Sequence, residues 1–174
     1  MPAAMRGRAF AITTTICIRW AQQQQGVLES MNVLILGATG FIGSAIARKL
    51  AAEGHVVTGL GRHPERAQNQ FNNMKWLKAD LRHLAQASDW THLLEGQQIV
   101  VNCAGALQDG LQDDLVASQQ AAMLALYQAA QRAGIRLVVQ ISANTEAAGA
   151  DTAFLATKRQ ADQALMRSGL PHVI

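Results

Sequence analysis

The sequence predicts an α/β fold, a doubly wound parallel sheet of the Rossmann type with helices on both faces. From Met31 onward, short apolar segments alternate with longer segments whose apolar residues recur at helical spacing. This alternation is typical of parallel sheets, because each crossover between parallel strands needs a long connection. In addition, a glycine-spaced turn follows the first apolar segment. Hydrophobic residues make up 49% of the 174 residues, so the chain can bury a globular core.

Five apolar segments predict strands. They are Asn32–Leu36, His55–Leu60, Lys75–Lys78, Gln98–Cys103 and Arg136–Ile141. Helices are expected at about Phe41–Glu53, Leu111–Ala133 and Thr152–Arg167, and glycines typical of helix ends follow the first two. Residues 170–174 predict the beginning of a further strand. We therefore expect residues 31–174 to be an incomplete Rossmann domain whose C-terminal, substrate-binding part is truncated.

Residues 1–30 differ in composition from the remainder. They hold three arginines, one glutamate and an apolar stretch, Ala9–Ile18, that is shorter than the roughly 20 residues a membrane-spanning helix needs. We expect either a disordered N-terminal extension, which is the favoured interpretation, or a targeting segment. No transmembrane segment is predicted.

Cysteine content and charge limit the location and the partners. Two cysteines, Cys17 and Cys103, are too few for a disulfide framework, and Cys103 is expected to be a small buried residue. A cytoplasmic location is predicted, with peripheral association with a membrane complex left open. Residues 31–174 carry a net charge of only +1, which argues against nucleic-acid binding.

The glycine-spaced turn, Gly37-Ala38-Thr39-Gly40-Phe41-Ile42-Gly43, predicts a nucleotide site. The first glycine permits a tight turn, the second allows the backbone to approach a pyrophosphate, and the third lets the helix pack closely on the sheet. The helix that follows offers unpaired N–H groups and a positive dipole end. The predicted cofactor-binding residues here are Gly37, Thr39, Gly40, Phe41, Ile42 and Gly43.

The end of the second strand indicates which dinucleotide is bound. An acidic residue at this place holds the ribose 2′-hydroxyl of NAD, whereas an arginine favours the 2′-phosphate of NADP. The sequence there reads Gly59-Leu60-Gly61-Arg62, with no acid. Arg62 therefore predicts NADP, with NAD as the alternative, since an arginine at a strand end can also be a solvated charge.

Two further strand ends supply candidate cofactor contacts. Asp80 and Leu81 follow the third strand, where the carboxylate either accepts a hydrogen bond from adenine or only forms a turn. Ala104 and Gly105 follow the fourth strand, where small residues either admit the nicotinamide-side ribose or only permit close packing.

Taken together, these motifs resemble the short-chain dehydrogenase/reductase superfamily over residues 31–174. The resemblance is to its extended and atypical branch, which includes epimerase/dehydratase-like proteins and the NAD(P)H-binding subunit of respiratory complex I. It implies a catalytic serine after the fifth strand and a Tyr-x-x-x-Lys motif on the next helix, in which lysine lowers the tyrosine pKa and binds the ribose. Ser142 and Lys158 match these positions, but Phe154 stands where the tyrosine would be.

Because this tyrosine is absent, the sequence leaves two functional predictions open. A phenyl ring transfers no proton, and the only tyrosine, Tyr127, is expected to pack in the core. We predict an NAD(P)-binding protein without standard tyrosine-dependent catalysis, in a structural, assembly or redox-sensing role. The alternative is an active NAD(P)-dependent oxidoreductase or sugar-nucleotide epimerase/dehydratase-like enzyme in which Ser142, Thr157 or another residue supplies the proton. Lys158 can bind the ribose or be a solvated charge, and a homodimer or a protein partner is left open.

Overall fold

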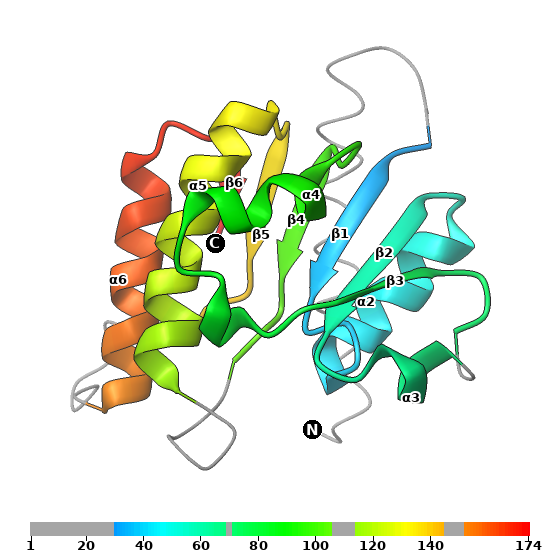
Figure 1. Ribbon diagram of the computed structural model, residues 1–174, viewed down its shortest axis with the longest axis horizontal. Helices are drawn as coiled ribbons and strands as arrows, with labels where there is room; N and C mark the ends of the chain where they lie inside the picture. The colour runs from blue at the N-terminus through cyan, green and yellow to red at the C-terminus, as the bar shows by residue number, and fades with distance from the viewer. Residues whose placement is uncertain (1–29, 69–70, 106–113, 145–151) are drawn as a thin grey trace.

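The computed structural model describes residues 30–68, 71–105, 114–144 and 152–174. Six parallel strands form one sheet in the order β3-β2-β1-β4-β5-β6 (Figure 1). Their bounds are β1 Asn32–Leu36, β2 Val56–Gly61, β3 Lys75–Lys78, β4 Ile99–Asn102, β5 Leu137–Gln140 and β6 His172–Val173. The predicted doubly wound α/β fold is confirmed.

The strand predictions differ from the structure only at their ends. The first and third strands have the predicted bounds, and the second is shifted by one residue. The fourth and fifth lack their outermost predicted residues. Cys103 consequently lies just beyond β4 and is only partly buried. Apolar character therefore marked each strand, but hydrogen bonding to the neighbouring strands decides its ends.

The helices cover both faces of the sheet. They are α2 Phe41–Ala52, α3 Pro64–Gln68, α4 Thr91–Leu94, the π-helix η3 Val116–Ala121, α5 Ala122–Ala133 and α6 Ala153–Arg167, with 3₁₀ turns η1 Leu81–His83 and η2 Ala87–Trp90. The predicted ends at Gly54 and Gly134 are confirmed, since both glycines adopt left-handed backbone conformations with φ of 87° and 68°.

The helix predicted over Leu111–Ala133 needs a correction. Its first residues lie outside the described part of the chain, and Val116–Ala121 is a π-helix that continues into α5. Such widened turns occur mostly as short insertions in α-helices, and apolar periodicity does not reveal them. The short helices α3 and α4 were not predicted, since segments of four or five residues show no helical period.

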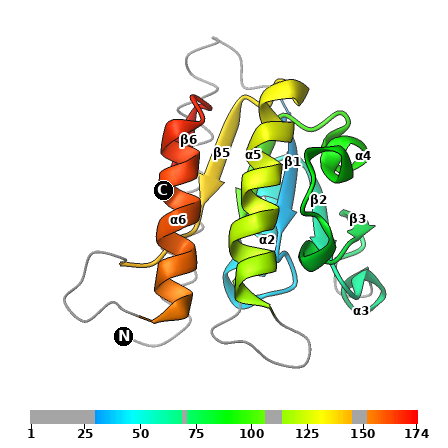
Figure 2. The same ribbon diagram turned by 60° about the vertical axis from the view of Figure 1, so that its left-hand side comes forward.

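Alternate side chains of the strands build two apolar layers. Leu34 and Leu36 point into the layer that holds Trp90, α5 and α6, whereas Val33 and Ile35 point into the layer that α2 covers. Figure 2 shows α5 and α6 side by side over one face of the sheet and α2 on the other. Within the described residues, no helix combines the length and apolar character needed to cross a membrane.

Candidate functional site

The strand order places a crevice between β1 and β4. The chain builds outward from β1 to β3, returns beside β1 as β4, and then builds outward in the other direction. In open α/β sheets, ligands bind at the carboxyl ends of the strands where the order reverses in this way. A cavity of about 330 Å³ lies at this edge, between the turn after β1 and the segments after β2, β3 and β4.

The turn after β1 is built from backbone at very short range. Gly37 has a left-handed φ of 70°, and its carbonyl accepts a hydrogen bond from the Gly40 amide at 3.0 Å. A Cβ on Gly37 would lie 3.0 Å from Ala104 backbone atoms, and one on Gly43 would lie 2.2 Å from the Gly37 carbonyl oxygen. The turn, the start of α2 and the segment after β4 are therefore packed closely enough to require glycine.

The first turn of α2 begins at the edge of the cavity, which Gly40 lines. Gly40 caps the helix with extended backbone and makes no side-chain cap bond. The first helical residues, Phe41 to Ser44, include no acid that would occupy these amides. Such a helix start attracts an anion through its N–H groups and its dipole.

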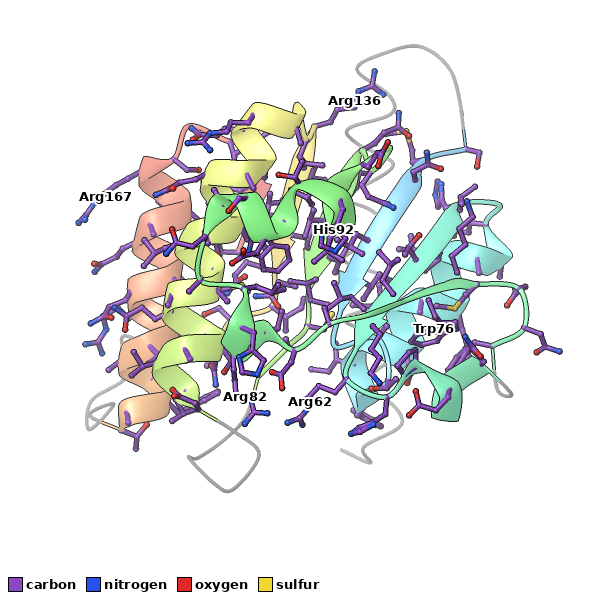
Figure 3. All side chains as sticks on the ribbon, viewed as in Figure 1. Arg62, Trp76, Arg82, His92, Arg136 and Arg167 are labelled. Atoms are coloured by element: carbon purple, nitrogen blue, oxygen red, sulfur yellow. The ribbon has the colours of Figure 1, made fainter. Side chains whose placement is uncertain are left out.

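The opposite wall of the cavity carries two arginines and one aspartate. Arg62 follows β2, whereas Asp80 and Arg82 lie at the end of β3 and in η1. Figure 3 shows Arg62 and Arg82 at the same edge of the sheet. This wall therefore combines a net positive charge with the cavity opening.

The Asp80 carboxylate is hydrogen-bonded to Arg82, two residues further along the chain. Its carboxylate accepts hydrogen bonds from Arg82 Nε and NH2, the latter at 2.6 Å, and from the Arg82 backbone amide at 3.1 Å. The Arg82 side chain, despite some desolvation, holds the pKa of Asp80 below its usual range. The turn-forming role considered for Asp80 is therefore present, and it fixes Arg82 at the cavity wall.

The cavity side formed by the segment after β4 meets α6. Lys158 Nζ donates to the carbonyl oxygens of Ala104 and Ile141, each at 3.1 Å. A Cβ on Gly105 would lie 3.6 Å from Nζ and 4.0 Å from the Phe154 ring. Gly105, Phe154 and Lys158 thus lie together at this side of the cavity.

Lys158 is not a solvated helix charge, because its side chain is only 4% exposed. Burial lowers its pKa, while the Asp162 carboxylate and Cys103 raise it. Cys103 itself is a poor nucleophile, since burial raises the pKa of its thiol to about 12.

Ser142 lies two residues after the end of β5 and donates its hydroxyl hydrogen to Asp162 Oδ2 on α6. Asp162 is 7% exposed, and burial raises its pKa while Ser142, Lys158 and Gln140 lower it. Thr157 is 5% exposed and donates to the carbonyl oxygen of Phe154 at 2.9 Å. A proton-transfer role for Thr157 is disfavoured, since its hydroxyl points along the helix rather than toward the cavity.

A buried amide network joins these groups to β4. Asn102 Nδ2 donates to Gln140 Oε1 at 2.8 Å, and Asn102 Oδ1 accepts from the Ala104 amide at 3.0 Å. Tyr127 is 2% exposed and donates to the same Gln140 oxygen at 3.3 Å. Tyr127 thus lies in the core behind the site, and burial raises its pKa.

The predicted site residues fall into two groups. Eight line the cavity: Gly37, Thr39, Gly40, Arg62, Asp80, Leu81, Ala104 and Gly105. The remaining candidates lie beside it, in the start of α2 (Phe41, Ile42, Gly43) and at the junction of β5 with α6 (Ser142, Phe154, Lys158). The structure adds Arg82, Ser118, Gln119 and Asp162, which the sequence reasoning did not select.

A signal for Asp162 is present in the sequence. It follows Lys158 by four residues and therefore lies on the same helix face. Ser118 and Gln119 had no such signal, because they reach the cavity from the π-helix η3. Across the described ranges, no group of three histidine, cysteine or acidic side chains is placed to hold a metal ion.

Comparisons with known proteins agree with this geometry. A 77-residue segment is 33% identical to the chloroplastic epimerase family protein SDR39U1 homolog of Arabidopsis thaliana, covering 44% of this chain and 21% of that protein. The fold is similar to that of WbmG from Bordetella bronchiseptica in complex with NAD, with a TM-score of 0.69 and 17% identity over 84% of this chain and 53% of that one.

A second solved structure is similar to the same extent. It is a short-chain dehydrogenase/reductase superfamily protein from Agrobacterium tumefaciens with bound NAD, with a TM-score of 0.69 and 16% identity over 82% of this chain and 48% of that one. The chain therefore spans about half the length of these two solved chains. At such identities the likeness shows the fold alone.

A family model gives the assignment. It is the model of the NAD(P)H-binding family, and it matches residues 37–174, from the first glycine of the turn to the last residue of the sequence. With the structures above, it supports the prediction of a nicotinamide dinucleotide as the cofactor class. The resemblance to epimerase/dehydratase-like short-chain dehydrogenase/reductases is confirmed, and the chain belongs to the NAD(P)H-binding family.

Proposed function

We propose that this protein binds NADP in the cavity between β1 and β4 and does not use tyrosine-dependent catalysis. Its role is then structural, in assembly, or in sensing the redox state of the coenzyme. One observation carries the proposal: a cavity walled by the glycine turn, Arg62 and Gly105 has a buried Lys158 beside it, and Phe154 stands next to Gly105 where a phenol would be needed.

The residues present fit a dinucleotide along the whole path. The backbone at Gly37 and Gly43 leaves no room for a Cβ, which is the arrangement that brings helix N–H groups against a pyrophosphate. Gly105 lines the cavity next to Lys158, since a Cβ on it would lie 3.6 Å from Nζ. A bound nicotinamide coenzyme would supply hydride transfer, and the protein would supply binding and orientation.

NADP is favoured over NAD by the charge of the cavity wall. Arg62 lies at the end of β2, and the wall beside it carries Arg82 rather than an uncompensated acid. The carboxylate of Asp80 is held by Arg82, so it does not oppose a phosphate as a free charge would. A guanidinium group binds a phosphate by paired, charge-assisted hydrogen bonds.

Calorimetric titration of the full chain with NADPH and NADH tests the proposal. We expect saturable binding of both coenzymes, with NADPH bound about tenfold more tightly because of one added charge-assisted contact. Absence of binding by both would overturn it. Equal affinity for both coenzymes would retain the site and remove the preference for NADP.

An active NAD(P)-dependent oxidoreductase or epimerase/dehydratase-like enzyme is the second candidate. It is favoured by the hydrogen bond between Ser142 and Asp162, because this pair holds a hydroxyl and a carboxylate close to Lys158. Phe154→Tyr separates the two candidates. Hydride turnover that is present before the substitution and unchanged after it supports the enzyme, whereas turnover gained only with the tyrosine supports the binding protein.

Location and association extend the same proposal. We propose a cytoplasmic protein that forms a homodimer or binds a protein partner. Leu124 on α5 and Met166 on α6 are exposed apolar side chains on the two helices that would pair. Size-exclusion chromatography with light scattering tests this association.

A further inference from the structure

Asp162 has no assigned role, yet it is a buried acid within the site. Its side chain is 7% exposed, and one carboxylate oxygen, Oδ1, has no hydrogen-bond partner among the described residues. The other oxygen accepts the Ser142 hydroxyl hydrogen. Burying a carboxylate is costly unless nearby charges and hydrogen bonds compensate, so the position requires an explanation.

Lys158 is the nearby cation. It lies one helical turn before Asp162 on α6, and both side chains are buried. The Asp162 carboxylate raises the pKa of Lys158, and Lys158 lowers that of Asp162, so each favours the charged form of the other.

The ammonium group of Lys158 is also oriented. Two of its three N–H donors are taken by the carbonyl oxygens of Ala104 and Ile141. Gly105 lines the cavity, and a Cβ on it would lie 3.6 Å from Nζ, in van der Waals contact. The third donor is therefore available to a ligand bound beside Gly105.

Further hydrogen bonds hold one of the two carbonyl groups that bind the Lys158 ammonium. Ala104, whose carbonyl oxygen binds Lys158, is held through its amide by Asn102, and Asn102 is held by Gln140. The Gln140 side chain in turn lowers the pKa of Asp162. These hydrogen bonds thus connect the lysine with the surroundings of Asp162.

We propose that Asp162 is a positioning residue of the cofactor site, whose buried carboxylate holds the Ser142 hydroxyl and supplies a negative charge one helical turn from the Lys158 ammonium, the group that would bind the cofactor ribose. The inference rests on the proposed function, since it requires a dinucleotide beside Gly105. It assigns Asp162 no contact with the coenzyme.

The alkaline dependence of coenzyme binding tests the inference. Fluorescence titrations with NADPH from pH 7 to pH 10 follow the charge of Lys158, because the coenzyme loses a charge-assisted hydrogen bond when the ammonium deprotonates. The other titratable groups facing this cluster, the Cys103 thiol and the Tyr127 phenol, have raised pKa values and stay protonated over this range. In the wild-type protein we expect the affinity for NADPH to fall toward the upper end of this pH range.

Asp162→Asn should move this fall in affinity to lower pH by about one unit, the scale of a charge interaction across one helical turn. Asp162→Glu, which restores the carboxylate, should return the fall toward its wild-type position. Ser142→Ala keeps the carboxylate and should move it by less than half the Asp162→Asn shift. Lys158→Met should bind weakly and without the alkaline fall.

Glu95→Gln is the matched control, since it removes the same charge at an exposed residue after α4. An unchanged midpoint in Asp162→Asn, or an equal shift in Glu95→Gln, would overturn the inference. If Asp162→Asn does not fold, Asp162→Ala serves as the second charge-removing variant and is subject to the same criterion. Loss of NADPH and NADH binding by the wild-type protein would instead end the proposed function, and the inference with it.

Discussion

The two ends of the site are formed by different groups, backbone at one end and buried side chains at the other. The turn after β1 is made of backbone. A Cβ on Gly43 would collide with the Gly37 carbonyl, and Gly37 has a left-handed φ beside the Ala104 backbone. The junction of β5 with α6 is made of buried polar side chains, in which Ser142, Lys158 and Asp162 compensate one another. The first end has little room for an added atom, and the second depends on buried charges. Substitutions should therefore damage the first through shape and the second through electrostatics.

Gly43→Ala should have the largest effect, because it adds the atom for which the turn has least room. Its Cβ would lie 2.2 Å from the Gly37 carbonyl oxygen, and neither group can move without shifting backbone. We expect a loss of at least about 2 kcal/mol in the free energy of unfolding, as for other overpacked sites. Urea denaturation of the full chain measures it.

Gly61→Ala is the control for this substitution. A Cβ on Gly61 would meet no atom within 4 Å, and the residue ends β2 close to the same cavity. Its free energy of unfolding should change by no more than about 0.5 kcal/mol. Similar losses in the two variants would contradict the close packing of the turn.

Lys158→Met should have the next largest effect, on coenzyme affinity. Methionine keeps an apolar stem of similar length, but it removes the donor held by Ala104 and Ile141. We expect NADPH affinity to fall by about tenfold to a hundredfold, the range for a hydrogen bond from a charged group. Calorimetry measures it, with Lys75→Met at the exposed start of β3 as the control. Unchanged affinity would place the coenzyme away from α6.

Arg62→Ser probes the cavity wall between these two ends and should act on one coenzyme only. The dissociation constant for NADPH should rise about tenfold, whereas that for NADH should hardly change, because only NADPH carries the 2′-phosphate. Arg132→Ser, at the exposed end of α5, is the charge-matched control. Equal losses for both coenzymes would show that Arg62 binds a group that the two share.

The same division explains what could be predicted from the sequence. Gly37, Gly40 and Gly43 lie within seven residues of one another, so their spacing alone indicated the turn, although the contact of Gly37 with Ala104 depends on tertiary structure. The strands and main helices were also predicted, since Val33 to Leu36 and the face of α2 each follow a local period. Phe154 and Lys158 were found only through the resemblance, because their place beside Gly105 depends on a contact across 50 residues of chain.

The residues that were missed depend on tertiary structure alone. Asp162 is adjacent to Ser142 only because α6 packs beside the end of β5. Arg82 lies at the cavity wall because Asp80 caps η1 and binds its guanidinium group. Gln119 lines the cavity from a π-helix, whose wider turn apolar periodicity does not reveal.

Asp80→Asn should have the smallest effect, and its pH dependence identifies the cause. Arg82 holds the pKa of Asp80 below its usual range, so the folded state is stabilised by the charged carboxylate. This stabilisation is fully present above the pKa of the unfolded chain, near 4, and is lost as the pH falls through the lower pKa of the folded state. Because both side chains are partly exposed, we expect a difference of at most about 1 kcal/mol at pH 7.

Urea denaturation of both proteins between pH 7 and pH 3 follows this difference. It should shrink as the wild-type carboxylate becomes protonated, and 1 M NaCl should reduce it at neutral pH, because salt screens a partly exposed ion pair. The asparagine side chain can still accept the Arg82 amide, so η1 should be retained. A difference that stays the same from pH 7 to pH 3 would show that Asp80 stabilises the fold through its shape and not through its charge. The cavity wall would then resemble the glycine turn rather than the charged junction at α6.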